Sequence, residues 1–149
     1  MVMMLSSSGV PREGTRTSIV DQRTPLTARI ALVAGALFAF LAVGLGAFGA
    51  HALKARLPAD ALAVWQTAVL YHGWHALALV GAGAVLLQRP GASGVTCAAW
   101  LFCAGIVLFS GSLYALALTG VKSLGMVTPV GGVLFLAGWL ALAWGAWRA

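Results

Sequence analysis

Four long apolar stretches, separated by short polar connections, constrain the fold of this chain more than any other feature. They cover about residues 28–50, 61–87, 95–118 and 128–147. About 20 apolar residues in a helix cross the hydrocarbon core of a bilayer, which is roughly 30 Å thick. A helix also satisfies its own backbone hydrogen bonds in lipid. We therefore predict an all-α polytopic membrane protein, with four transmembrane helices packed as an antiparallel bundle.

The charged residues are too few for a soluble protein. Nine Lys or Arg and three Asp or Glu make up 8% of the 149 residues, whereas a soluble domain has roughly 25%. The net charge of +6 does not indicate nucleic-acid binding, because the basic residues form no cluster on one predicted face. We expect the lipid bilayer as the main partner and no nucleic acid.

The chain begins with a polar segment over residues 1–27. It is rich in Ser, Thr and Arg and contains Pro11 and Pro25, a composition typical of a disordered tail. It lacks the order of a signal peptide, in which basic residues precede an apolar core. We predict two parts, a disordered N-terminal tail at 1–27 and a four-helix transmembrane domain at 28–149.

The basic residues also predict an orientation, since cytoplasmic segments carry an excess of Lys and Arg. The tail, the 88–94 turn and the C-terminus form one side and hold six of them. The other side holds three, and His51 and Lys54 should be interfacial near Pro58. Both termini are therefore predicted in the cytoplasm, and the membrane is predicted to be the bacterial inner (plasma) membrane. The two sets are Arg12, Arg16, Arg23, Arg29, Arg89 and Arg148, against Lys54, Arg56 and Lys122.

Two histidines near the middle of the second span are the strongest candidates for a site. His72 and His75 are three residues apart and share a helix face, and ionisable residues at membrane depth often indicate function. Other polar residues of the second and third spans complete a candidate intramembrane polar cluster. They are Gln66, Tyr71, Ser110, Ser112 and Tyr114.

A structural role for these histidines is favoured over a chemical one. Each imidazole can hydrogen-bond a hydroxyl of the third span, which would fix the helix packing. No Asp or Glu occurs in residues 61–149, which argues against a cation exchanger and against a hydrolytic triad. Two histidines on one helix face need a second helix or a second copy to hold haem. We predict no catalytic residue, no metal, no cofactor and no enzymatic activity.

The fourth span has three further features. Thr128 and Pro129 have the types of an N-cap and a first-turn proline. Small residues at 137, 141 and 145 form a stripe suited to close helix contact, within the bundle or between copies. Trp139, Trp144 and Trp147 are expected to lie progressively closer to the headgroups.

Several segments in the same order make this chain similar to the YgdD-like family of small inner-membrane proteins, also called domain of unknown function 423. The likeness covers about residues 28–147 and leaves out the tail. It implies a four-span inner-membrane protein and supplies no catalytic residue. The segments are GAFGAHALK (46–54), WQTAV (65–69), HALAL (75–79), FSGSLY (109–114), LALTG (116–120), TPVGG (128–132) and GW (138–139).

Two functions follow as hypotheses. The first is a non-enzymatic accessory or structural membrane component, because the chain has little soluble domain and no catalytic set. The alternative is a carrier for a small neutral or anionic solute, using a polar path lined by the His, Tyr and Ser residues of the cluster. A membrane-protein partner or a homo-oligomer is compatible with both.

Overall fold

The computed structural model describes residues 25–148, so nearly all of the predicted tail, residues 1–24, lies outside the described residues. Within the described range every element is helical. The elements are α1 (Leu26–Phe48), the π-helical turn η1 (Gly49–Leu53), α2 (Ala59–Gln88), α3 (Ser93–Gly105), the π-helical turn η2 (Ile106–Ser110), α4 (Gly111–Thr119), the 3-10 turn η3 (Lys122–Met126) and α5 (Thr128–Trp147).

These elements form four helices long and apolar enough to cross a membrane, which confirms the predicted fold class. They are Leu26–Leu53, Ala59–Gln88, Ser93–Thr119 and Lys122–Trp147. Most extend two or more residues past the predicted apolar stretches, because helical hydrogen bonding continues into polar flanking residues such as Asp60 and Gln88. The third span is continuous from α3 through η2 to α4.

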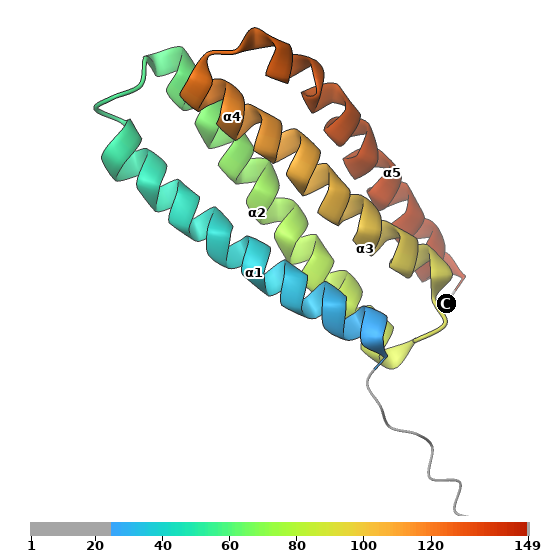
Figure 1. The fold of residues 1–149 in the computed structure, drawn as a ribbon. Helices are drawn as coiled ribbons and strands as arrows, with labels where there is room; N and C mark the ends of the chain where they lie inside the picture. Colours follow the sequence, from blue (N-terminus) through green and yellow to red (C-terminus); the bar gives the residue numbers. More distant parts are fainter. Residues whose placement is uncertain (1–24, 149) are drawn as a thin grey trace, which may run out of the picture.

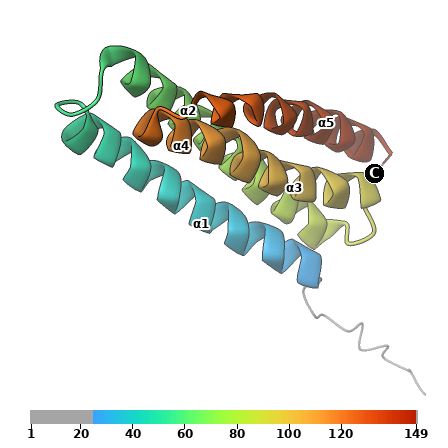
Figure 2. The ribbon, with the colours of Figure 1, turned by 45° about the horizontal axis from the view of Figure 1, so that its top comes forward.

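The four spans are antiparallel, and they pack in a particular order. The start of α1, the connection between α2 and α3 and the end of α5 lie at the same end of the molecule (Figure 1). Helix α1 packs on α2, α2 packs on α3 and α4, and α3 packs on α5. Helices α2 and α5 contact each other through side chains, without the close backbone packing of these other pairs. Helices α1 and α5 lie at opposite edges (Figure 2).

Glycines bring α5 close to the third span at both ends of their contact. A Cβ on Gly94 would lie 2.8 Å from the Cα of Gly145. A Cβ on Gly131 would lie 2.7 Å from the Cα of Phe109. Such backbone contact is typical of small residues in membrane helices. Gly145, the last residue of the predicted small-residue stripe, thus packs within the bundle.

The connection between the third and fourth spans differs from the sequence prediction in one detail. Gly120 ends α4 with φ of 69°, a left-handed conformation that glycine adopts without strain. Pro129 lies in the first turn of α5 as predicted. The N-cap prediction for Thr128 was wrong, because Val127 holds the cap position and Thr128 is already helical. The Thr128 hydroxyl instead contacts Ser112 across the helix interface.

The neighbouring glycines of α5 give a direct test of this packing. Gly131→Ala should destabilise the protein by about 1–3 kcal/mol, because the new methyl group would meet the backbone of Phe109. Gly132→Ala should be neutral or slightly stabilising, since its Cβ would lie 3.7 Å from the Phe109 ring and alanine favours the helix. Unfolding in detergent measures both variants. Equal stability of the two would contradict the described contact.

Candidate functional site

The two intramembrane histidines lie halfway along α2 and point to different neighbours. Both side chains are buried, with 4% of His72 and 5% of His75 exposed. The ring of His72 meets Phe38 of α1 edge-on and lies near Tyr114 of α4. The ring of His75 faces α3 and α5. Together they connect α2 to every other span.

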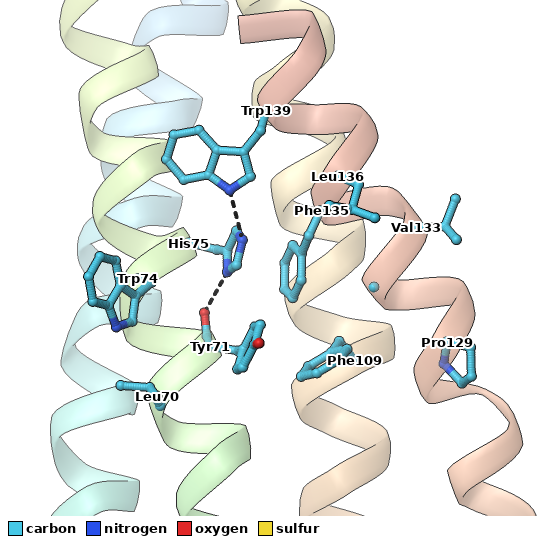
Figure 3. A pocket seen from close by; sticks show the side chains of 11 residues that line it. Leu70, Tyr71, Trp74, His75, Phe109, Pro129, Val133, Phe135, Leu136 and Trp139 are labelled. Carbon is cyan, nitrogen blue, oxygen red and sulfur yellow. Dashed lines mark hydrogen bonds between the residues drawn. The ribbon is translucent and has the colours of Figure 1, made fainter. Parts of the chain in front are cut away.

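His75 has hydrogen-bond partners at both ring nitrogens (Figure 3). Its Nδ1 lies 2.7 Å from the carbonyl oxygen of Tyr71, and the indole N–H of Trp139 donates to its Nε2 over 3.1 Å. Only a neutral imidazole with its proton on Nδ1 satisfies both contacts. The ring also stacks on Phe135 with centroids 3.4 Å apart and planes 9° apart. His75 therefore joins α2 to α5 by one hydrogen bond and one stacked ring.

His72 forms a second connection, towards α1 and α4. Its Nδ1 lies 3.2 Å from the hydroxyl oxygen of Tyr114. The Tyr114 ring packs on Trp65, with centroids 4.6 Å apart, and the Trp65 indole donates to the carbonyl of Leu45 in α1 over 3.0 Å. The Nε2 of His72 is buried without a partner among the described residues. This side of α2 is thus tied to α4 and α1.

The two predicted serines differ from each other in the structure. The Ser112 hydroxyl donates to the Phe109 carbonyl over 2.9 Å and lies 2.8 Å from the Thr128 hydroxyl. Since its single proton is used, Thr128 is the donor in their contact, which joins α4 to α5. Ser110, in η2, is fully buried, and its hydroxyl has no partner within residues 25–148.

The predicted cluster is therefore a set of separate contacts between helices. Gln66 is exposed on α2, outside these contacts. His51 and Lys54 are exposed at the end of the first span, away from the histidines of α2. Sequence reasoning missed Trp139 as a partner by expecting it nearer the headgroups. Trp139 is the twelfth residue of a helix of 20, which is too deep for the headgroup region. This depth could have indicated a partner inside the bundle.

A groove lies beside His75, between α2 and α5 (Figure 3). Its volume is about 690 Å³, within the roughly 300–1,000 Å³ of small-molecule sites. Its outer residues Leu70, Trp74, Val133 and Leu136 are exposed, so in a membrane it opens to the hydrocarbon. No lining residue carries a charge. The lining comprises Leu70, Tyr71, Trp74, His75, Phe109, Pro129, Gly132, Val133, Phe135, Leu136 and Trp139.

The polar groups at the groove are few and neutral. No group of three His, Cys, Asp or Glu side chains placed to hold a metal occurs in residues 25–148. The imidazole at the groove has both nitrogens engaged, and no carboxylate adjoins it. The groove therefore offers aromatic surface and neutral hydrogen-bond donors.

Four apolar spans, joined by buried neutral hydrogen bonds, define a small polytopic membrane protein. The chain belongs to the family described as "Protein of unknown function (DUF423)", which matches residues 45–132. That match runs from the end of α1 to the first turns of α5. It includes both histidines and Tyr114, the partner of His72, and it ends before Trp139, the partner of His75.

Bacterial relatives agree with this assignment. The UPF0382 membrane protein YwdK of Bacillus subtilis is 48% identical over 114 residues, 76% of this chain and 93% of the relative. A UPF0382 membrane protein of Staphylococcus saprophyticus is 45% identical over 120 residues, 80% of this chain and 98% of the relative. One of Staphylococcus aureus is 46% identical over 114 residues, with 76% and 92% covered. No solved structure matches the chain.

The two serines supply a matched test of the buried contacts. Ser112→Ala should lower the unfolding free energy by about 1 kcal/mol, because it removes the bond to Thr128. Ser110→Ala should leave stability unchanged or raise it, since it removes a buried hydroxyl that has no partner. The measurement is chemical unfolding in mixed micelles. A larger loss for Ser110→Ala than for Ser112→Ala would contradict the described hydrogen bonds.

Proposed function

We propose that this protein is a non-enzymatic accessory component of the membrane, which binds a hydrophobic molecule from the bilayer in the groove between α2 and α5. One observation carries this proposal. The groove is open to lipid, and the only imidazole that lines it is fully engaged in holding the helices. The site is therefore suited to binding and lacks a free acid or base.

The competing hypotheses find less support. An enzyme would need a reactive group at the groove, and none of the lining residues is a carboxylate, cysteine or serine. A carrier would need polar groups that line a path for its solute. The imidazoles and hydroxyls instead pair in separate contacts between helices, through His72, His75 and Ser112, and nothing in the relatives' names points to transport.

The walls of the groove favour a small molecule over a transmembrane helix. Close helix contacts in membranes use small residues, and here the glycines in tight contact, such as Gly94, Gly131 and Gly145, are used inside the bundle. The groove has bulky walls, including Trp74 and Trp139. We still predict a membrane-protein partner or a second copy, bound at another lipid-facing surface. Helix α1 is suited to such contact because most of it is exposed.

We further propose that the protein lies in the bacterial inner (plasma) membrane with both termini in the cytoplasm. The described cations support this orientation, because Arg29, Arg89 and Arg148 lie at the same end of the bundle (Figure 1). In a bacterial host, a C-terminal green fluorescent protein should fluoresce and a C-terminal alkaline phosphatase should be inactive. The reverse pattern would overturn the orientation.

Purification from native membranes tests the proposed binding. Mass spectrometry of the intact wild-type protein should show a bound hydrophobic molecule. Leu136→Trp should lose it, because the larger side chain fills the groove that Leu136 lines. Leu37→Trp, on an exposed leucine of α1 outside the groove, is the matched control and should keep it. If Leu136→Trp retains the same molecule at wild-type occupancy, the groove is not its site.

A further inference from the structure

We infer that the groove takes a neutral molecule of the quinone type, a flat carbonyl-bearing ring on an apolar tail. This inference rests on the proposed function and names the class of molecule that the groove binds. It concerns binding alone, with no electron transfer. Four properties of the groove support it: its depth, its charge, its free donors and its aromatic wall.

The depth of Tyr71 and the lack of charge argue against a phospholipid headgroup in the groove. Tyr71 is twelve residues beyond the start of α2 at Ala59, or about 18 Å along a helix of 30 residues. The α2 side of the groove is therefore near the middle of the bilayer, whereas Pro129 extends its α5 side to the first turn of that helix. Charged headgroups stay at the interface, whereas a neutral polar ring can enter the hydrocarbon region. None of the groove residues is charged, so none would compensate a charge on the ligand.

Two polar groups of the groove, the Tyr71 hydroxyl and the Trp74 indole N–H, each have a free hydrogen-bond donor. Tyr71 and Trp74 are 42% and 66% exposed. Within residues 25–148, the side-chain hydrogen bonds at the groove are those of His75 and Trp139. Neither the Tyr71 hydroxyl nor the Trp74 indole N–H takes part in them. Hydrocarbon offers these donors no acceptor. A carbonyl oxygen of a ligand would supply this acceptor, whereas an acyl chain or a plain hydrocarbon would not.

Three nearly parallel rings form an aromatic wall. His75 and Phe135 are buried, with 5% and 3% exposed, so the Tyr71 ring, 42% exposed, is the surface that a planar partner can reach. The planes of Tyr71 and His75 differ by 14°, those of His75 and Phe135 by 9°, and those of Tyr71 and Phe135 by 22°. Phe109 adjoins Tyr71, with centroids 4.7 Å apart. Aromatic faces prefer offset stacking with another flat ring. The exposed Tyr71 ring thus favours a conjugated ring over a saturated chain.

The test is photolabelling of the full chain in lipid nanodiscs with an azido-quinone that has a short alkyl tail. Labelling should saturate, decrease when decylubiquinone competes, and map to peptides of α2 and α5. Tyr71→Phe should weaken the competition about three- to tenfold, the effect of one lost hydrogen bond. Leu136→Trp should abolish the labelling, and Leu37→Trp should retain it.

A second competitor separates this inference from the proposed function. Farnesane, a branched hydrocarbon without oxygen, should compete poorly. If it competes as well as decylubiquinone and Tyr71→Phe has no effect, the groove binds apolar molecules in general, so the quinone assignment fails while the proposed function stands. If labelling never saturates and is unchanged in Leu136→Trp, the groove binds no small molecule and both fail. A crosslink between two copies through the groove would also overturn both.

Discussion

The contact between the His75 imidazole and the Trp139 indole is the interaction on which the arrangement of α2 and α5 depends. The backbones of these two helices do not pack closely on each other. They are joined by one hydrogen bond of 3.1 Å and by the stacking of His75 on Phe135. No water is available in hydrocarbon to replace a lost partner. Both nitrogens of His75 are paired within the bundle, and this pairing sets the separation of α2 and α5.

The position of α5 follows from two opposite kinds of contact. Towards the third span, Gly131 and Gly145 allow backbone to approach backbone. Towards α2, the rings of His75, Phe135 and Trp139 fill the space and keep the two helices apart. This difference leaves a groove between α2 and α5 that opens to the lipid. The same contacts that stabilise the bundle thus form the wall of the proposed binding site.

Much of the fold could be predicted from the sequence, and the details of the site could not. The length and apolarity of the stretches indicated four spans, and the position of His75 in its stretch indicated its depth. The partners depend on how each helix is rotated, which short-range patterns do not specify. Three hydroxyls were possible partners for His72, and only that of Tyr114 lies within reach. The π-helical turn η2 ends at Ser110. It rotates the residues beyond it about the helix axis, relative to a regular α-helix.

A double-mutant cycle between His75 and Trp139 measures whether their hydrogen bond holds α2 to α5. The unfolding free energy in mixed micelles would be measured for the wild type, His75→Phe, Trp139→Phe and the double variant, with the exposed Trp100→Phe as control. Each change keeps an aromatic ring and removes one side of the hydrogen bond. We expect a coupling energy of about 1 kcal/mol between His75 and Trp139. The Trp100→Phe control should leave the unfolding free energy unchanged. Additive losses, with no coupling, would contradict the claim that this bond holds α2 to α5.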